Sequence, residues 1–180
     1  MIEQAPSHLL PIIERIETFY TKEVKPREHQ LRHRLRNSLE YIDRTGKLHP
    51  EIQAARREIM QASGMEGLFS LHLPQSIGGG GLSRTEMFFI EEKVYSYGID
   101  LAPGILSWTD GSTPRLIFVR EELQDQFVKP LILGQKTSCH AVTEPDAGSN
   151  LFDMKTNAVQ KGGKWILNGH KAYITNPFEA

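Results

Sequence analysis

Val142-Thr143-Glu144-Pro145-Asp146-Ala147-Gly148-Ser149 is the most informative stretch of the chain, and it follows the change from a helical to an extended pattern near residues 135–139. A short strand ends here in a Pro-Asp turn, and we expect Gly148 to adopt torsions that a Cβ would forbid. Such a turn leaves backbone N–H groups and the hydroxyls of Thr143 and Ser149 free for a polar or anionic ligand. A solvated strand-to-loop turn is the simpler interpretation of these residues alone.

The chain before Gly134 has helical periodicity. In the first segment, which we expect to end near Pro26, apolar residues recur at three- and four-residue steps: Leu9, Ile12, Ile13, Ile16, Phe19, Tyr20 and Val24. Further helices are predicted at about 27–43, from Pro50 to a C′ glycine at Gly64, behind an S-x-x-E capping box at Ser83 and Glu86, from Pro114, and up to Pro130.

Short extended segments follow Gly134. Thr156–Gln160 and Trp165–Leu167 flank a Lys-Gly-Gly-Lys hairpin turn, and Ser138–Thr143 and His170–Thr175 are predicted as further strands. The fold class is therefore α+β, with an all-α domain at 1–137 and the first strands of an antiparallel β domain at 138–180. Because two or three strands are marginal alone, we expect a fragment of a longer protein.

Composition excludes several classes of protein. Lys plus Arg is 21 against Asp plus Glu 22 in 180 residues, so neither a nucleic acid nor an anionic membrane is expected as a partner. The longest apolar runs are four residues, and no secretory signal is visible, so we expect a cytoplasmic protein without a membrane span. His29 and His33 lie among arginines, and we expect no metal site there. Cys139 is expected to be a buried structural thiol.

Two motifs carry a resemblance. Residues 140–149 are similar to aromatic-x-V-T-E-P-x-A-G-S, and Asn168–Asn176 is similar to N-G-x-K-x-W-I-T-N, with a K-T-x-A element at Lys155–Ala158 between them. Pro74–Gly79, Glu91-Glu92 and residues 121–131 are similar to P-x-x-x-G-G, E-E and E-E-Q…P-P-L elements. Together they resemble the acyl-CoA dehydrogenase family over about residues 50–180. The resemblance implies that 138–180 begins an antiparallel β-barrel.

The resemblance also implies an FAD site, formed by His140, Ala141, Val142, Thr143, Gly148, Ser149, Tyr173, Ile174 and Thr175. By analogy, Thr143 would hydrogen-bond the pyrimidine side of the isoalloxazine. Ser149 would lie by the pyrophosphate and the acyl-CoA substrate. Residues 173–175 would cover one face of the ring, with Thr175 near the N5 atom that accepts hydride. The flavin supplies the redox chemistry, and the protein supplies hydrogen bonds that stabilise charge on the reduced ring.

Four residues depart from the family pattern. His140 replaces Tyr or Phe, Tyr173 replaces Trp, Asn150 replaces Asp, and Pro177 replaces a small residue. None of these changes removes a hydroxyl that the site needs. The family's catalytic base is a glutamate of a C-terminal domain, and no residue here matches it, so we expect no catalytic residue and no activity in this chain alone. Glu144 is interpreted as a structural turn residue.

The resemblance implies flavin-dependent α,β-dehydrogenation of an acyl-CoA thioester to the trans-2-enoyl-CoA. Electrons would pass to an electron-transfer flavoprotein or a similar acceptor, and the full-length protein would be a homo-oligomer. Two alternatives stay open. One is a flavin monooxygenase or oxidase of the same fold, and the other is a non-catalytic truncated chain or scaffold subunit.

Overall fold

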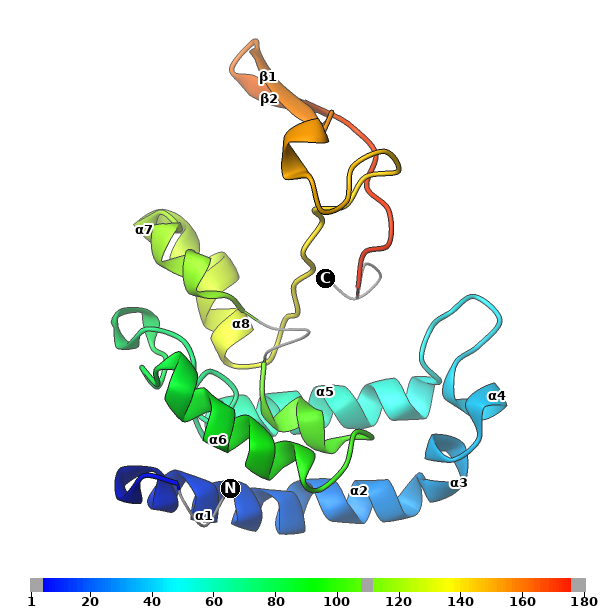
Figure 1. The fold of residues 1–180 in the computed structure, drawn as a ribbon, viewed down its shortest axis with the longest axis vertical. Coiled ribbons are helices and arrows are strands. Elements are labelled where there is room, and N and C mark those ends of the chain that lie inside the picture. Colours follow the sequence, from blue (N-terminus) through cyan, green and yellow to red (C-terminus); the bar gives the residue numbers. More distant parts are fainter. Residues whose placement is uncertain (1–4, 108–111, 176–180) are drawn as a thin grey trace. The chain divides into compact units, whose positions relative to one another are not determined.

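The computed structural model describes residues 5–107 and 112–175. The chain divides into two compact units, Met1–Thr137 and Ser138–Ala180, and each is considered by itself. The first unit is helical and the second carries both strands (Figure 1). A helical domain followed by a small antiparallel sheet confirms the predicted fold class.

The elements are as follows. The α-helices are α1 (Leu10–Phe19), α2 (Lys25–Gln30), α3 (Arg32–Leu35), α4 (Ser38–Tyr41), α5 (Pro50–Met65), α6 (Arg84–Tyr95), α7 (Glu121–Leu123) and α8 (Lys129–Ile132). The π-helical turns are η3 (Tyr20–Val24) and η7 (Gln124–Val128). The 3-10 turns are η2 (Ser7–Leu9), η4 (Gln75–Ile77), η5 (Ala102–Ile105), η6 (Pro114–Phe118) and η8 (Leu151–Asp153), and the strands are β1 (Asn157–Lys161) and β2 (Lys164–Asn168).

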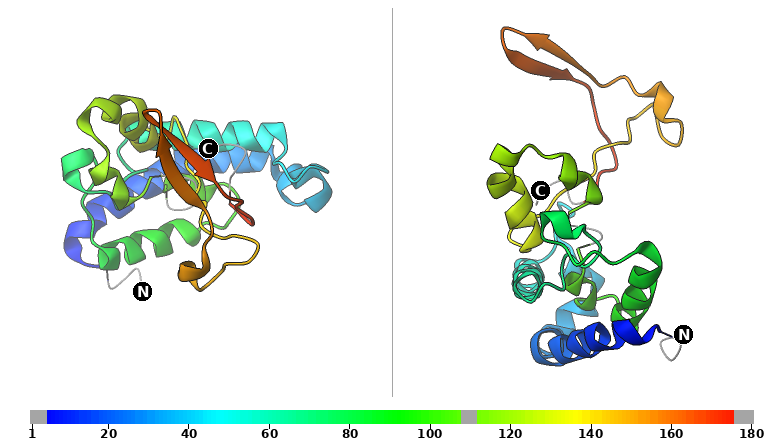
Figure 2. Two further views of the ribbon diagram at one scale, coloured as in Figure 1. Left: turned by 90° about the horizontal axis from the view of Figure 1, so that it is seen from above. Right: turned by 90° about the vertical axis from the view of Figure 1, so that its left-hand side faces the viewer.

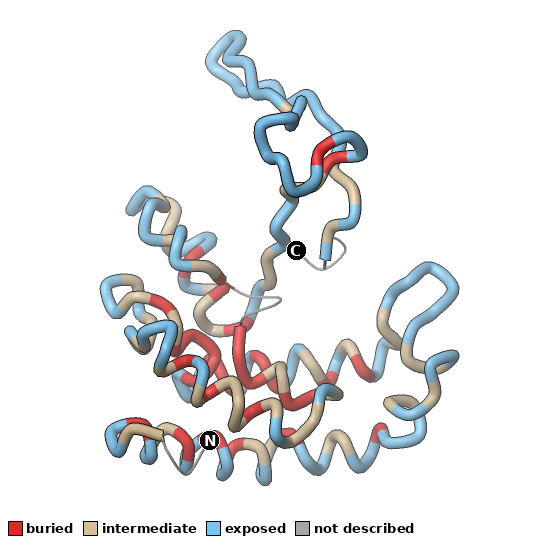
Figure 3. Tube along the Cα trace, viewed as in Figure 1, coloured by how far each residue is buried: buried red, intermediate tan, exposed pale blue. Residues whose placement is uncertain are grey.

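The core of the helical unit lies where α1, α5 and α6 meet the short turn η5 (Figure 2). Buried residues follow the inner faces of these elements (Figure 3). The largest fully buried side chains include Ile16, Phe19, Ile52, Ile59, Ile90 and Ile105. Burial of each such side chain contributes about 1.5–3 kcal/mol, so packing, more than helix propensity, holds this unit together.

The first helix does not end near Pro26, so that prediction was wrong. Pro26 is the second residue of α2, and the π-helical turn η3 joins α1 to α2. The backbone N–H of Lys25 donates to the carbonyl of Tyr20, five residues earlier. Proline lacks an N–H and its ring clashes with the carbonyl four residues earlier in an α-helix. The wider π turn relieves both conflicts, so the helical path continues through the proline.

A π-helical turn also precedes Pro130, where a second helix was predicted to end. The π-helical turn η7 precedes α8, whose second residue is Pro130. The N–H of Lys129 donates to the carbonyl of Gln124, again five residues earlier. Both sites carry the sequence Val-Lys-Pro, at residues 24–26 and 128–130. Val24 and Val128 are both buried, and Val24 belongs to the hydrophobic core of the helical unit.

Gly64 does not end α5 as a C′ residue, so this prediction was also wrong. It lies inside the helix and is buried, while Gly67 takes the left-handed conformation with φ +71°. A Cβ on Gly64 would clash with the backbone of Leu133. The glycine is needed for close packing against the end of α8, not for a turn.

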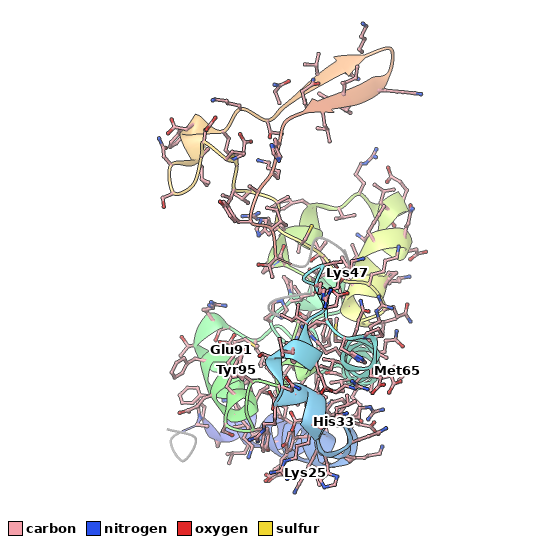
Figure 4. All side chains as sticks on the ribbon, turned by 90° about the vertical axis from the view of Figure 1, so that its right-hand side faces the viewer. Lys25, His33, Lys47, Met65, Glu91 and Tyr95 are labelled. Atoms are coloured by element: carbon pink, nitrogen blue, oxygen red, sulfur yellow. The ribbon has the colours of Figure 1, made fainter. Side chains whose placement is uncertain are left out.

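The segment predicted as one helix at 27–43 is broken into α2, α3 and α4. Asn37 has extended torsions and its side chain accepts a hydrogen bond from the N–H of Leu39, which starts α4. Arg34 binds Glu51 of α5 through two hydrogen bonds of 3.0 and 3.1 Å, and also contacts Glu40. Lys25 and His33 lie on the outer surface of these helices (Figure 4).

The start of α6 confirms the capping-box prediction. The Ser83 hydroxyl accepts a hydrogen bond from the N–H of Glu86, and the Glu86 carboxylate accepts one from the N–H of Ser83 at 2.7 Å. The free carboxylate oxygen of Glu86 lies 2.6 Å from Nε2 of His8. Two N–H groups at this helix terminus are therefore satisfied by side chains.

The second unit contains the predicted hairpin. β1 pairs with β2 in antiparallel register, with Val159 opposite Ile166. Gly162 and Gly163 both have positive φ, as a two-residue type I′ turn requires. The predicted strands Ser138–Thr143 and His170–Thr175 are not formed as a ladder within the described residues. One backbone bond, from the N–H of Ala172 to the carbonyl of Thr143 (3.0 Å), joins them.

Candidate cofactor-binding loops

A buried carboxylate organises the loops of the second unit. Glu144 is 6% exposed, and its Oε2 accepts a hydrogen bond from the N–H of Lys155 at 2.7 Å. Its Oε1 accepts from the N–H of Thr156 at 3.0 Å. These bonds fasten residue 144 to the segment that leads into β1. The interpretation of Glu144 as a structural residue is therefore confirmed.

Lys171 adds a second connection to the same place. Its Nζ donates to Oε1 of Glu144 and to the carbonyl of Val142, each at 2.9 Å, and lies 3.7 Å from Sδ of Met154. The lysine side chain is 24% exposed and that of Glu144 is 5% exposed. Water screens the attraction between these two charges less than it screens an exposed pair. The segments around residues 143 and 172 are thus joined by an ion pair and two backbone contacts.

The surroundings of Glu144 strongly favour its charged form. The nearby Thr156 hydroxyl, then the Lys171 ammonium and the Lys155 N–H, lower the pKa of Glu144 to about 2. Burial acts in the opposite direction and is outweighed. A carboxylate with so low a pKa, and with both oxygens occupied, is a weak base.

The Pro-Asp turn after Glu144 is closed by two backbone bonds. The N–H of Glu144 donates to the carbonyl of Ala147 (2.9 Å), and the N–H of Ala147 donates to the carbonyl of Glu144 (3.2 Å). Gly148 follows, but its φ is not in the left-handed region, and a Cβ there would meet no atom within 4 Å. The expectation of special torsions at Gly148 was therefore wrong. The packing of this unit does not require a glycine at that position.

Three predicted site hydroxyls have no hydrogen-bond partner among the described residues. They belong to Thr143, Ser149 and Thr175. Ser149 and Thr175 are exposed, and Thr143 is half-buried. Thr143 lies between Val142 and Glu144, the two residues that Lys171 contacts, so its backbone is fixed while its hydroxyl stays available. This set of donors fits a polar cofactor.

Tyr173 has an unusual backbone conformation. Its φ is +56°, in the left-handed region, and the residue is 92% exposed. For a non-glycine residue this conformation costs about 1–2 kcal/mol. It also ends the extended run that was predicted for His170–Thr175, because a left-handed residue cannot continue a strand. Ile174 is half-buried, beside the exposed ring.

The remaining predicted residues precede the turn. His140 and Ala141 are exposed and Val142 is half-buried, with its carbonyl bound to Lys171. Cys139 is also exposed, so the expectation of a buried thiol was wrong, because this segment is not covered by other residues of its unit. The structure thus brings Thr143 close to Ala172 and the adjoining Tyr173. Among the described residues, no hydrogen bond or ion pair joins Ser149 to that pair.

Lys171 was not among the site residues predicted from the sequence motifs. It is the lysine of the N-G-x-K element, and the only signal was its place in that motif. The backbone N–H groups of Lys155 and Thr156 were missed as well, because a partner eleven or twelve residues from Glu144 carries no local signature.

Other kinds of site receive no support from the described parts of the chain. In residues 5–107 and 112–175, no three His, Cys, Asp or Glu side chains gather as metal ligands would. Over the same ranges, no helix is both long and apolar enough to cross a bilayer. Asn176 and Pro177 of the second motif lie outside the described residues.

Comparison with models of known protein families assigns both units to one family. The family model of the acyl-CoA dehydrogenase N-terminal domain matches residues 9–135, and that of the acyl-CoA dehydrogenase middle domain matches residues 139–180. The chain therefore belongs to the acyl-CoA dehydrogenase family, as the motifs predicted.

Individual relatives agree with this assignment. A 3-(aryl)acrylate reductase of Clostridium sporogenes is 34% identical over 123 residues, which covers 66% of this chain and 32% of the relative. The human mitochondrial short-chain specific acyl-CoA dehydrogenase is 34% identical over 117 residues, covering 63% and 28%. An acyl-CoA dehydrogenase of Bacillus anthracis, solved with FAD, superposes with a TM-score of 0.68 at 27% identity, covering 99% and 28%. The chain spans about a third of the length of these relatives.

Proposed function

We propose that this chain contributes part of the FAD site of a flavin-dependent acyl-CoA dehydrogenase. In this proposal residues 1–137 form the helical domain and residues 138–180 begin the β-barrel domain. Family membership supports the class of reaction, and the FAD complex of the similar Bacillus anthracis enzyme supports the cofactor. The observation that carries the proposal is the set of three unpartnered hydroxyls on Thr143, Ser149 and Thr175.

The proposed contacts are made by both loops. The cofactor-binding residues are His140, Ala141, Val142, Thr143, Gly148, Ser149, Tyr173, Ile174 and Thr175. Ser149 is also proposed to contact the acyl-CoA substrate. The packing of the unit does not itself require a glycine at position 148. A cofactor that lies close to the backbone there would explain why the residue is glycine. The open space at its α-carbon accommodates such an approach.

FAD, when bound, supplies the acceptor for the two electrons removed from Cα and Cβ of the acyl thioester. The residues of this chain hold and orient it, and their hydroxyls donate hydrogen bonds to its polar atoms. Glu144 is not proposed as the base that removes the α-proton, because its carboxylate is buried, bound and weakly basic. We propose that the base belongs to a part of the family fold beyond these two domains, so that this chain alone is inactive.

The whole protein is proposed to act on an acyl-CoA and to form the trans-2-enoyl-CoA. Its electrons would pass to an electron-transfer flavoprotein or a similar acceptor, and its subunits would assemble into a homo-oligomer in the cytoplasm. Two relatives are named as reductases, a 3-(aryl)acrylate reductase and a subunit of a caffeyl-CoA reductase complex. The direction of the reaction is therefore part of what the experiment tests.

The test begins with the protein expressed from its complete reading frame. We expect a flavin absorbance spectrum that survives desalting and is bleached anaerobically by a saturated acyl-CoA. A colourless protein that cannot be reconstituted with FAD would support the scaffold alternative and overturn the proposal. Rapid reaction of the reduced flavin with oxygen, coupled to oxygenation or oxidation of the substrate, would instead favour the monooxygenase or oxidase alternative.

Three variants then test the residues. Thr143→Val, Ser149→Ala and Thr175→Val each remove one hydroxyl at nearly constant shape. One hydrogen bond contributes about 0.5–1.5 kcal/mol, so each variant should weaken FAD binding by up to about tenfold. Thr18→Val in α1 is the control, because its hydroxyl bonds only the carbonyl of Glu14 in the same helix. Unchanged FAD affinity in all three variants would contradict the proposed contacts.

A further inference from the structure

The Lys171 side chain contacts the residue before Thr143 and the residue after it. Its Nζ contacts the carbonyl of Val142 and Oε1 of Glu144, both at 2.9 Å. The carbonyl of Thr143 itself accepts a hydrogen bond from the N–H of Ala172 at 3.0 Å. Three consecutive residues of one loop are therefore fastened to two consecutive residues of the other.

The residue that follows this connection is strained. Tyr173 has φ +56° and an almost fully exposed ring. A left-handed tyrosine persists only where neighbouring contacts hold the backbone in place. Its neighbours Lys171 and Ala172 carry those contacts, and the ring makes none that could do so.

We propose that Lys171 is a positioning residue that holds Thr143 and Tyr173 in a fixed relation, so that both meet the same flavin ring. This inference rests on the proposed function, and it adds a residue that touches no cofactor in that proposal. An ammonium group suits the task because it carries three donors on a flexible stem. A neutral side chain of the same length fills the space but releases both Val142 and Glu144.

The chain offers a matched control. Lys155 lies in the same unit, and its Nζ pairs with Asp146 at 2.9 Å. Both of these side chains are more than 70% exposed, so this ion pair is screened by water. Removal of the Lys155 side chain leaves its backbone N–H on Glu144 unchanged. Lys155→Met therefore removes one lysine charge from the unit without touching the connection between the loops.

The experiment compares Lys171→Met, Lys171→Arg and Lys155→Met in the protein expressed from its complete reading frame and loaded with FAD. We expect Lys171→Met to weaken FAD binding at least about tenfold and to shift the visible flavin spectrum and the reduction potential. Lys171→Arg should give values of FAD affinity, flavin spectrum and reduction potential between those of Lys171→Met and the wild type. Arginine keeps the positive charge but not the three-donor geometry of the ammonium group. Lys155→Met should match the wild type in all three measurements.

A second measurement needs no flavin. The N–H of Ala172 donates to the carbonyl of Thr143. Its hydrogen–deuterium exchange should be faster in Lys171→Met than in the wild type, and unchanged in Lys155→Met. If the wild type binds FAD while both Lys171 variants keep its spectrum and potential, Lys171 is only structural. That result overturns this inference and leaves the proposed function standing. A wild type that binds no FAD overturns the proposed function, and this inference with it.

Discussion

A Cβ atom on Gly64 would lie 2.3 Å from the carbonyl carbon of Leu133. The reverse contact is equally close, since a Cβ on Gly134 would lie 2.3 Å from the carbonyl oxygen of Met60. The backbones of α5 and of the segment that ends α8 therefore touch directly. This contact fixes the last helix of the helical unit against its longest one.

Gly64→Ala should separate these two elements. Overpacking of this kind costs about 1–3 kcal/mol and outweighs the gain of about 1 kcal/mol in helix propensity. Because the Cβ would meet backbone atoms, we expect the upper end of this cost, so the free energy of unfolding of the helical unit should fall by a net of about 2 kcal/mol in urea titrations followed by circular dichroism. Gln61→Ala, at an exposed position of α5, is the control and should change it by less than about 0.5 kcal/mol. Equal stability of the two variants would rule out the contact.

Ser83→Ala should remove the cap of α6 and cost about 1 kcal/mol of unfolding free energy. The Ser83 hydroxyl and N–H, followed by His8, lower the pKa of Glu86 to about 2. The variant loses the first of these causes, so the pKa of Glu86 should rise, as carbon-13 NMR titration would measure. Arg84→Ala, at the next and exposed position, is expected to leave the pKa and the stability unchanged. A pKa that stays near 2 in Ser83→Ala would contradict the role of the cap.

Tyr20 should make the helical unit sensitive to alkali. Its ring stacks on Tyr97 with centroids 3.8 Å apart, and its hydroxyl donates to Oε2 of Glu28 at 3.0 Å. Burial, then Glu28, raises the pKa of Tyr20 from 10.0 to about 12. The neutral phenol thus stabilises the fold fully below pH 10, and this contribution is lost as the pH rises towards 12.

Ultraviolet titration of tyrosinate can test this behaviour. Tyr20→Phe should remove the part of the tyrosinate absorbance change that occurs near pH 12. The free energy of unfolding should also fall less between pH 10 and pH 12 in this variant than in the wild type. Tyr41→Phe serves as the control, since its hydroxyl makes no hydrogen bond in the described structure. A Tyr20 that ionises near pH 10 would show that the phenol is not shielded as described.

Glu144 should make the second unit sensitive to acid. Its pKa is lowered from 4.5 to about 2, so the charged form stabilises the fold at every pH above about 4.5. That contribution declines as the pH falls below 4.5 and is gone once the pH is below about 2. We expect amide exchange at Lys155 and Thr156, after correction for the intrinsic rate, to accelerate over this interval.

Glu144→Gln should reproduce the acid state at neutral pH. One end of the glutamine amide is an NH₂ group, so it faces one of the N–H donors that the carboxylate accepts. Loss of one buried hydrogen bond should accelerate exchange of these amides by about tenfold. The exposed Asp146 provides the control, as Asp146→Asn should leave them unchanged. Wild-type exchange in Glu144→Gln would contradict the anchoring role of this carboxylate.

Local signals in the sequence predicted local features of the fold. The Lys-Gly-Gly-Lys turn and the Ser83 capping box depend on neighbours within a few residues, and both are present. The two prolines were misinterpreted because a proline normally ends a helix, and nothing local reveals the π turn that accommodates it. Gly64 was assigned to a turn because its partner Leu133 lies far away in the sequence.

In the candidate site, too, some features were predicted from the sequence and others depend on contacts between distant residues. The hydroxyls of Thr143, Ser149 and Thr175 followed from a family motif, and the structure leaves them without partners. The connection through Lys171 depends on an approach of residues twenty-seven positions apart, which no spacing rule predicts. The left-handed backbone of Tyr173 is likewise set by its surroundings, since tyrosine has no preference for it.

The π-helical turns constrain how this chain can gain or lose residues. Phe19 and Val24 are both buried although they lie five residues apart, because η3 holds one residue more than an α-helical turn. A deletion within η3 would restore the four-residue spacing of one helix face, since 3.6 residues complete a turn. The core stripe would survive, but Pro26 would then clash with the preceding turn. We therefore expect the extra residue and the proline to be gained or lost together, so that relatives with a gap at this point carry another residue in place of the proline.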